Sequence, residues 1–489
     1  MKLSNATLST LSERVAQPTY DRSRVTNGIV HIGVGGFHRA HEAVYIDDLL
    51  RQGEIGWGIT GVGLLPQDRN MRNALTAQDC LYTVVEQSAS GDMARVVGSI
   101  TRYFLAADNP EVVLQAMAAP QTRIVSLTIT EGGYNFNQGT GEFIGDNPDV
   151  IHDLAYPETP VSVFGYVVEA LNRRRLSGAP PFTLLSCDNL PHNGAVARKM
   201  FLAFAALREQ ALADWIENNV TFPNSMVDRI TPQTTDRDRE RIRNEFGIDD
   251  AWPVVCEPFR QWVIEKKFCN GRPPLENAGV QFTYDVHPFE LIKLRLLNGS
   301  HSVMGYLGYL AGYRLIPDVI ADPAFHAFIE ALMKDEVAPL LTAPPGIDLA
   351  EYQQTLLTRF ANPAIADQVQ RICLDGSSKI SKFLLPSIRK ALEQNRPIQK
   401  LTLALAGWFR YLTGTDEQGN PIEINDPQSS ELQRLAKIGG ADPRPLLSLQ
   451  NIFGDLSNND HFVQSLTSAL KTLTTIGAKE AIRQSIKRS

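Results

Sequence analysis

The sequence is poor in cysteine, has no long hydrophobic run and carries no surplus of positive charge. Its five cysteines are scattered and form no Cys-x-x-Cys pair, which argues against a disulfide framework and a zinc ribbon. No segment approaches the roughly 18 consecutive apolar residues that a membrane-spanning helix needs. A formal charge of −7 argues against a nucleic-acid partner. With a polar start that resembles no secretory signal, these absences predict a cytoplasmic protein without membrane or nucleic-acid partners.

The composition is that of a large globular protein. Of the 489 residues, 43% are hydrophobic and 21% are charged, which argues against a disordered or low-complexity chain. A chain of this length is long enough to bury a sizeable core, and it is expected to divide into two or three domains.

In the first two thirds of the chain, short apolar runs rich in β-branched residues alternate with longer stretches of helical periodicity. The runs that we predict as strands are 28–34, 57–64, 123–130, 182–187 and 253–256. Alternation of this kind is typical of a mostly parallel, doubly wound sheet with helices on both faces. Strands that are apolar throughout, rather than alternating, also fit a sheet covered on both sides.

Beyond about residue 285 the character of the sequence changes, because helical patterns dominate and strand-like runs become scarce. The longest predicted helices are 288–313, 323–337, 401–412 and 460–487. We therefore expect an α/β N-terminal domain of residues 1–284 with a Rossmann-type sheet, followed by an α-helical C-terminal domain of residues 285–489.

A glycine-rich segment follows the first predicted strand directly. Its residues are Gly33, Val34, Gly35, Gly36, Phe37, His38 and Arg39. Gly33 would permit a tight turn and Gly35 a close approach of the backbone to a pyrophosphate, with the N-terminus of the next helix favouring its negative charge. His38 breaks the strict G-x-G-x-x-G pattern, so an ordinary glycine turn stays an alternative.

A carboxylate for the ribose of a dinucleotide is expected at the end of the second strand. Asp68 stands there, and it would bind the ribose hydroxyls and repel a 2′-phosphate, which favours NAD over NADP. Arg69, its neighbour, could accommodate that phosphate instead. An aspartate in an ordinary surface loop is the other alternative.

Four hydrogen-bonding side chains share one face of the helix predicted from residue 288. They are Glu290, Lys293, Asn298 and His301, and at 3.6 residues per turn they fall within an arc of roughly 140°. Glycines at 305, 308 and 312 continue that face and predict that a ligand or another backbone packs closely against it. The alternative is a solvated face with an ion pair between Glu290 and Lys293.

These residue types suit the oxidation of a secondary alcohol by hydride transfer, which needs a base for the hydroxyl proton and donors for the developing alkoxide. Lys293 could be the base if its pKa fell well below the usual value of about 10.4. Asn298 and His301 could polarise the oxygen. Asn189 and Asp228 follow apolar runs of the sheet, where ligands bind in open α/β folds, although capping and turn roles are open for both.

The spacing Lys293-x4-Asn298-x2-His301, together with the glycine segment, resembles the long-chain polyol dehydrogenase/reductase family. Segments 126–134, 247–259 and 375–379 extend the resemblance to essentially the whole chain. The resemblance implies a metal-independent, NAD-dependent dehydrogenase that oxidises D-mannitol to D-fructose and catalyses the reverse. It also implies a monomer, which is frequent in the family.

The resemblance also implies roles for individual residues. Lys293 matches the catalytic base, Asn189 and Asn298 the amides that stabilise the oxyanion, and His301 a substrate-orienting residue. Further matches are the substrate-binding residues Asp228 and Arg371, and the cofactor-binding residues Gly33, Gly35, Gly36, Phe37, His38, Arg39 and Asp68. Glu290, three residues before the base, is our hypothesis for a proton relay.

Several other functions stay open on the sequence alone. A D-mannonate/fructuronate oxidoreductase would need an arginine for the substrate carboxylate, and Arg371 could serve. A D-arabinitol 4-dehydrogenase is a further alternative, and an NAD-binding sensor is the alternative without catalysis. The sequence contains no Tyr-x-x-x-Lys and no His-Glu-x-x-His, so short-chain dehydrogenase and zinc-hydrolase chemistry are not indicated.

Overall fold

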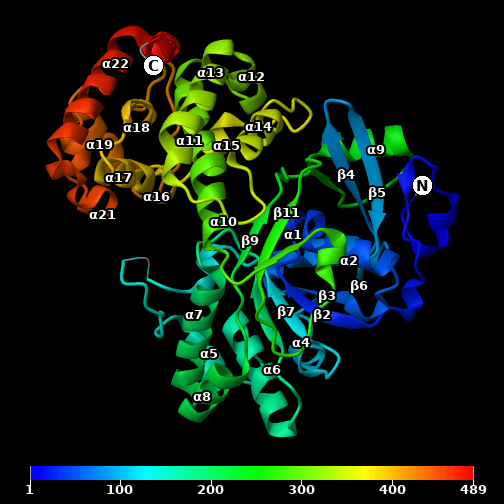
Figure 1. Ribbon diagram of the computed structural model, residues 1–489. Helices are drawn as coiled ribbons and strands as arrows, with labels where there is room; N and C mark the ends of the chain where they lie inside the picture. Colours follow the sequence, from blue (N-terminus) through cyan, green and yellow to red (C-terminus); the bar gives the residue numbers. More distant parts are fainter. Residues whose placement is uncertain (1, 138, 488–489) are drawn as a thin grey trace. The chain divides into compact units, whose positions relative to one another are not determined.

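A computed structural model describes residues 2–137 and 139–487 of the chain, which forms two compact units (Figure 1). The first unit runs from Met1 to Val286, and the second runs from His287 to Ser489. The first unit contains strands and helices. Every named element of the second is a helix within the part of the chain that is described.

The first unit is built around a five-stranded sheet in which all strands run parallel, in the order β6-β3-β2-β7-β8. Its strands are β2 (Asn27–Ile32), β3 (Gly58–Gly63), β6 (Ile100–Leu105), β7 (Ile124–Leu127) and β8 (Thr183–Ser186). From β2 the chain adds β3 and β6 on one side of the sheet, and it then returns to add β7 and β8 on the other side. This doubly wound order confirms the Rossmann-type prediction.

Apolar side chains cover both faces of this sheet, as continuous apolar strands require. On one face Val30 and Leu184 belong to a core with α4 (Pro110–Ala118), α6 (Val163–Ser177) and α7 (Asn193–Arg208). On the other face Ile29 and Leu185 belong to a core with α1 (Gly36–Ala40) and α2 (Glu42–Arg51). Neighbouring residues of one strand therefore serve opposite layers, and the carboxyl ends of the strands are left for loops.

Two smaller sheets complete the first unit. One has the order β1-β5-β4-β10, and the other has the order β12-β11-β9. Their strands are β1 (Val15–Ala16), β4 (Tyr82–Ser88), β5 (Gly91–Val97), β10 (Val254–Cys256), β9 (Ser225–Asp228), β11 (Gln261–Glu265) and β12 (Gln281–Thr283). Only β10 among them was predicted from its sequence.

Two helices that look continuous in the sequence are each broken in the structure. The helix after the glycine segment is interrupted at His41, whose φ and ψ are −119° and −91°. His41 Nε2 lies 2.9 Å from the carbonyl oxygen of Gln261, and this contact helps to fix the break. The stretch 195–218 is likewise two helices, α7 and α8 (Gln210–Asn219), because Glu209 is extended with φ of −163°.

The second unit packs its helices around one continuous hydrophobic core. The helices are α10 (His287–Ile292), α11 (Gly299–Leu310), α12 (Ile316–Ala321), α13 (Pro323–Ala331), α14 (Leu349–Phe360), α15 (Val369–Ile372), α16 (Gly376–Phe383), α17 (Leu385–Glu393), α18 (Gln399–Tyr411), α19 (Ser429–Gly439), α20 (Arg444–Leu447), α21 (Gln450–Phe453) and α22 (Asp460–Lys487). α18 and α22 share the most extensive of these helix contacts.

The predicted helix 288–313 is not a regular α-helix. A π-helical segment, η7 (Lys293–Asn298), lies between α10 and α11, and the helix ends at Leu310. Gly312 therefore lies beyond the helix, in the left-handed conformation with φ of +93°. A second π-helical segment, η8 (Leu332–Val337), continues α13. At both places the backbone departs from the 3.6 residues per turn of a regular α-helix.

α22 contains a break at Gly477, whose φ and ψ are 77° and 170°. The Glu417 side chain reaches this point and accepts a hydrogen bond of 2.6 Å from the backbone N–H of Ala478. The part of the chain that the structure describes has no helix with the length and apolar character needed to span a membrane.

Candidate active site

The glycine segment forms a tight turn at the carboxyl end of β2. Gly33 has φ of +93°, and a Cβ added to it would lie 2.2 Å from the carbonyl oxygen of Thr128, so glycine is required at this position. Gly35 is exposed, and the nearest atom to an added Cβ would be 3.8 Å away. The turn therefore presents open backbone, which fits the close approach of a pyrophosphate.

The side chains of His38 and Arg39, predicted to bind the cofactor, lie inside the protein at 1% exposure each. The Arg39 guanidinium donates to the carbonyl oxygens of Gly35 and Trp252. The His38 ring stacks on His31 with 3.4 Å between ring centroids. Both residues therefore support the glycine turn from within, whereas Phe37 and Gly36 remain half-buried at its surface.

Asp68 follows β3 and is half-buried. Its Oδ2 accepts a hydrogen bond of 2.9 Å from the backbone N–H of Leu65. A Cβ on Gly63 would lie 2.5 Å from Asp68 Cβ, so this glycine lets the aspartate sit against the end of the strand. The neighbouring Arg69 is paired with Asp108 at 2.8 Å. A carboxylate beside the glycine turn fits a ribose with free hydroxyls.

Asn189 lies in the exposed loop that follows β8, next to the buried Asp188. Asp188 accepts hydrogen bonds from the backbone N–H groups of Ile129 (3.2 Å) and Thr130 (2.8 Å) and from the Tyr134 hydroxyl (2.7 Å). Burial raises the pKa of Asp188 above its usual value. Asp188 thereby ties the loops after β7 and β8 together, a role that sequence reasoning missed although Asp188 stands directly before Asn189.

The other predicted residue of the first unit, Asp228, is the last residue of β9 and is buried. Its neighbour Arg229 is also buried and donates to the carbonyl oxygens of Ala40 (2.6 Å) and Glu257 (3.0 Å). The first unit thus brings the glycine turn, Asp68 and Asn189 to the carboxyl edge of the five-stranded sheet. Asp228 comes from the separate sheet β12-β11-β9.

In the second unit, Lys293 is the first residue of the π-helical segment and Asn298 is the last. Lys293 is only 8% exposed. A π-helix has about 4.4 residues per turn, so residues five apart are separated by about 50°, against about 140° in an α-helix. The departure from regular helix geometry therefore brings Lys293 and Asn298 closer to one face than the sequence predicts. Single π-helical turns are frequent at functional sites.

Glu290 and His301 lie one turn to either side of this segment. Glu290 is buried, and its Oε2 lies 3.7 Å from His287 Nδ1. His301 is half-buried, and its ring packs on Phe360 with 4.7 Å between centroids. A buried lysine with a carboxylate, an amide and an imidazole on the same helix offers a base, a donor and a route for protons.

The glycines after His301 serve helix packing. A Cβ on Gly305 would lie 2.9 Å from the Ile372 side chain of α15, and one on Gly308 would lie 2.7 Å from the Val319 side chain of α12. The close neighbours of both glycines are side chains of other helices. The expectation that a ligand or another backbone packs against this face is therefore wrong for Gly305 and Gly308. Gly305 lets α15 approach α11, and α15 also carries Arg371.

Arg371, predicted to bind substrate, forms two parallel hydrogen bonds with the buried Asp367. Its Nε lies 2.8 Å from Oδ1 and its Nη2 lies 2.7 Å from Oδ2. The guanidinium is thus oriented by a carboxylate four residues earlier, while about half of its side chain stays exposed. Asp367 was missed in the sequence because it lies before α15 begins, so it does not belong to a pair of residues four apart on one helix.

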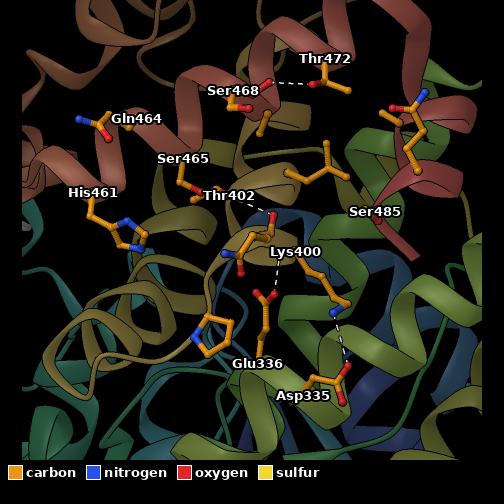
Figure 2. A pocket seen from close by; sticks show the side chains of 16 residues that line it. Asp335, Glu336, Lys400, Thr402, His461, Gln464, Ser465, Ser468, Thr472 and Ser485 are labelled. Atoms are coloured by element: carbon orange, nitrogen blue, oxygen red, sulfur yellow. Dashed lines mark hydrogen bonds and ion pairs between the residues drawn. The ribbon is translucent and has the colours of Figure 1, made fainter. Parts of the chain in front are cut away.

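A cavity of about 720 Å³ in the second unit lies between α18, α22 and η8, and none of the predicted site residues lines it (Figure 2). The hydroxyls of Thr402, Thr472 and Ser485 donate to carbonyl oxygens of their own helices at 2.9 Å. Lys400 Nζ lies 3.4 Å from Asp335 Oδ2. These hydroxyl groups are thus bonded to the backbone, and the Lys400 amine is paired with η8.

Two models of protein families match the chain over most of its length. The model of the mannitol dehydrogenase Rossmann domain matches residues 27–277. The model of the mannitol dehydrogenase C-terminal domain matches residues 285–474. The matches fall on the two units separately and together include every predicted site residue.

Individual relatives match the whole chain. A mannitol 2-dehydrogenase of Phaeosphaeria nodorum is 50% identical over 99% of this chain and 85% of its own length. A solved structure of Pseudomonas fluorescens mannitol 2-dehydrogenase, a ternary complex with NAD and D-mannitol, is 47% identical over 100% of both chains with a TM-score of 0.90. A solved substrate-free D-sorbitol dehydrogenase is 42% identical over 99% of this chain and 100% of its own, with a TM-score of 0.92.

Proposed function

Because the chain belongs to the mannitol dehydrogenase family, we propose that it oxidises D-mannitol at C2 to D-fructose with NAD⁺ and catalyses the reverse reduction. The observation that carries this proposal is the buried Lys293, which begins a π-helical segment that ends in Asn298. The Pseudomonas fluorescens enzyme that binds NAD and D-mannitol is similar over the whole chain, which supports the same substrate and cofactor here.

The first unit has the features that a dinucleotide requires. The open backbone of Gly35 receives the pyrophosphate, and Asp68 accepts hydrogen bonds from the ribose hydroxyls. When bound, NAD⁺ supplies the acceptor for the hydride that leaves C2. The proton chemistry belongs to side chains, and no metal ion takes part in the proposed reaction.

Lys293 removes the proton of the C2 hydroxyl as the hydride departs, which requires that its amine be uncharged before the reaction. Its burial favours the uncharged form, because desolvation penalises an ammonium. Asn298 and Asn189 donate hydrogen bonds to the oxygen on which negative charge develops. An amide does not ionise near neutral pH, so these donors are available at every pH at which the enzyme works.

Three further residues complete the proposed site. His301 orients the substrate, while Asp228 and Arg371 bind hydroxyls away from C2. The pairing of Arg371 with Asp367 fixes the fork of the guanidinium and offsets its charge. A neutral polyol needs no free positive charge there, whereas the carboxylate of mannonate would have to compete with Asp367. The geometry therefore favours a polyol over a sugar acid.

Replacement of Asp68 by alanine is expected to raise KM for NAD⁺ about tenfold to a hundredfold, since a charged hydrogen-bond acceptor for the ribose is lost. The kcat at saturating cofactor should stay near the wild-type value. Initial rates with NAD⁺ and NADP⁺ measure the change in preference. Arg69→Ala serves as the control, because Arg69 is held by Asp108. A loss of NADP⁺ activity in Arg69→Ala, with Asp68→Ala unchanged, would reverse the assignment.

We also propose that Glu290 relays the proton of Lys293 to solvent. Glu290→Gln keeps the shape of the side chain but cannot carry a proton, so it should lower kcat about tenfold and change the pH dependence of kcat. The test is to measure kcat of the wild type and the variant from pH 5 to pH 10, at low and at high buffer concentration. A pH profile identical to that of the wild type would rule out the relay.

A substrate panel tests the proposed function directly. NADH formation is measured with D-mannitol, D-sorbitol, D-arabinitol and D-mannonate, each with NAD⁺ and NADP⁺. D-Mannitol with NAD⁺ should give the highest kcat/KM. The similarity to a D-sorbitol dehydrogenase makes D-sorbitol the strongest competitor. No NADH from any of the four would contradict an enzymatic role and leave the NAD-binding sensor as the better interpretation.

Oligomeric state and compartment complete the proposal. We propose a monomer that works in the cytoplasm, in line with the resemblance to a family of frequent monomers. All five cysteines are free thiols, and four of them are buried, which suits a reducing compartment. Light scattering of the purified protein should give a mass near 54.1 kDa.

A further inference from the structure

A group of buried polar side chains lies beneath the glycine turn, on the inner side of β2 and the two helices that follow it. His31, His38 and Glu42 are 0%, 1% and 2% exposed. Neither His31 nor Glu42 has a part in the proposed chemistry. Burial of a carboxylate among imidazoles is costly unless each group is paired, so their partners indicate what the group does.

A chain of hydrogen bonds connects Glu42 to the glycine turn. Glu42 Oε1 accepts from the Ser126 hydroxyl at 2.8 Å, and Ser126 Oγ lies 2.8 Å from His31 Nδ1. On the other side of the ring, His31 Nε2 lies 2.9 Å from Thr128 Oγ1. The Thr128 hydroxyl in turn donates to the carbonyl oxygen of Gly33 at 2.7 Å. The chain thus ends on the first glycine of the turn.

The direction of each proton in this chain follows from the partners. Thr128 uses its single hydroxyl proton for Gly33, so it must accept from His31 Nε2. Ser126 uses its proton for Glu42 and lies 2.8 Å from His31 Nδ1, which also lies 3.1 Å from Glu42 Oε2. His31 thus links the hydroxyls of Ser126 and Thr128, and its ring faces the Glu42 carboxylate.

The charge state of Glu42 agrees with this assignment. Burial raises the pKa of Glu42, but hydrogen bonds from His31 and His38 outweigh burial and hold the pKa well below its usual value. Glu42 is therefore ionised. Burial lowers the pKa of His38 to about 4, so His38 is neutral beside its stacked neighbour. Hydrogen bonds with a charged partner are about twice as strong as neutral ones, which stiffens the chain.

The same three side chains have the composition of a metal site, since their donor atoms lie within 4.8 Å of one another. Their geometry argues against it. The rings of His31 and His38 are stacked with only 15° between their planes, and lone pairs lie in the plane of a ring. Two parallel rings therefore cannot both point at one ion. Both nitrogens of His31 are also already engaged with hydroxyls.

We propose that His31 and Thr128 are positioning residues for the dinucleotide, because their hydrogen-bond chain from Glu42 holds the Gly33 carbonyl and fixes the glycine turn before the cofactor binds. This inference rests on the proposed NAD binding. Glycine is free to adopt many backbone conformations, and Gly33 is held at φ of +93°. A turn that is already ordered loses less conformational entropy on binding, which raises affinity without touching the chemical step.

The test compares Thr128→Val with Thr128→Ser. Valine has nearly the shape of threonine but neither donates to Gly33 nor accepts from His31, whereas serine keeps the hydroxyl. Thr128→Val should raise the Kd for NADH, measured by calorimetry, about tenfold and raise KM for NAD⁺ similarly. Its kcat at saturating NAD⁺ should stay within about twofold of wild type. Thr128→Ser should restore the Kd to within about twofold.

Thr122→Val is the matched control. The Thr122 hydroxyl is a buried donor to the carbonyl oxygen of Ala116 at 2.7 Å, so its loss removes a similar bond far from the turn. It should lower Tm and leave the Kd for NADH unchanged. The inference is overturned if Thr128→Val binds NADH like the wild type, or if Thr122→Val or Thr128→Ser weakens binding equally. Wild-type protein that does not bind NADH would remove the proposed function, and this inference with it.

Discussion

Replacement of Lys293 by alanine is expected to lower kcat for D-mannitol oxidation by about 10³-fold to 10⁴-fold, the contribution of a well-placed general base. The loss should appear in kcat and in kcat/KM alike, because the amine acts as the proton is transferred and not in holding the substrate. Added primary amines of small size should recover part of the rate. Steady-state kinetics with and without methylamine measure both effects.

Lys400→Ala is the control for this variant. Lys400 is buried to a similar degree in the same unit, at 6% exposure, but it lines the cavity beside α22 and pairs with Asp335. Its removal tests what the loss of a buried lysine does to the helical unit in general. NADH binding should be the same in both variants and in the wild type. A kcat of Lys293→Ala within tenfold of wild type would show that another group is the base.

Asn298→Ala is expected to lower kcat by about 10²-fold to 10³-fold, which is the usual effect of removing one donor to a developing oxyanion. Asn189→Ala should have an effect of the same size if the two amides donate to the same oxygen. The double variant then shows whether the two amides act together or independently, because the effects of residues that act as a unit on the activation free energy are not additive. The kcat values of the two single variants and the double variant give the interaction energy between the two amides.

Asn451→Ala provides the control for the amide variants. Asn451 is an exposed residue of α21, and its side-chain amide donates to Gln428 Oε1 at 3.0 Å, so its loss removes a surface hydrogen bond of the helical unit. It should keep the wild-type kcat. If Asn298→Ala changed KM for D-mannitol and left kcat intact, its amide would bind the substrate without stabilising the transition state. The proposed role of Asn298 would then be wrong.

Four strands of the central sheet were predictable because they are apolar on both faces, whereas β6 was missed because exposed and half-buried residues interrupt its buried ones. Ile29 and Val30 are adjacent and both buried, one toward each layer of helices, so the run stands out in the sequence. β5 was missed for the opposite reason, because Met93 is 64% exposed and the nearby Asp92 and Arg95 are polar, so the strand forms no apolar run. Its antiparallel partner β4 was missed although Tyr82, Val84 and Val85 are buried.

The residues proposed for the site in the second unit were chosen from their types and spacing, but their backbone geometry was not predictable. The segment from Lys293 to Asn298 is rich in leucine and reads as an ordinary α-helix. Leu296 and Leu297 are buried in the core of the second unit, and no residue type in the segment marks its π-helical form. Tertiary context routinely overrides local preference, so local sequence does not fix the backbone geometry here.

Supporting residues were harder still to predict. His31 and Asp188 lie within strands or directly after them, where a polar residue reads as an exception in an apolar run. Only the structure reveals that each one holds backbone or hydroxyl groups of a neighbouring loop. A systematic search for polar residues near the carboxyl ends of predicted strands would have identified both as candidates.

The π-helical segment has the geometry of one residue inserted into an α-helix. Its five steps from Lys293 to Asn298 turn the chain by about 410°, and four steps of an α-helix turn it by about 400°. Deleting a single residue, with return to the narrower helix, would therefore keep the residues that follow, His301 included, on nearly the same face. A further inserted residue has no such compensation and would rotate them by roughly 80° to 100°. Insertions at this point would therefore be more damaging than deletions, even though no side chain of the site would be altered.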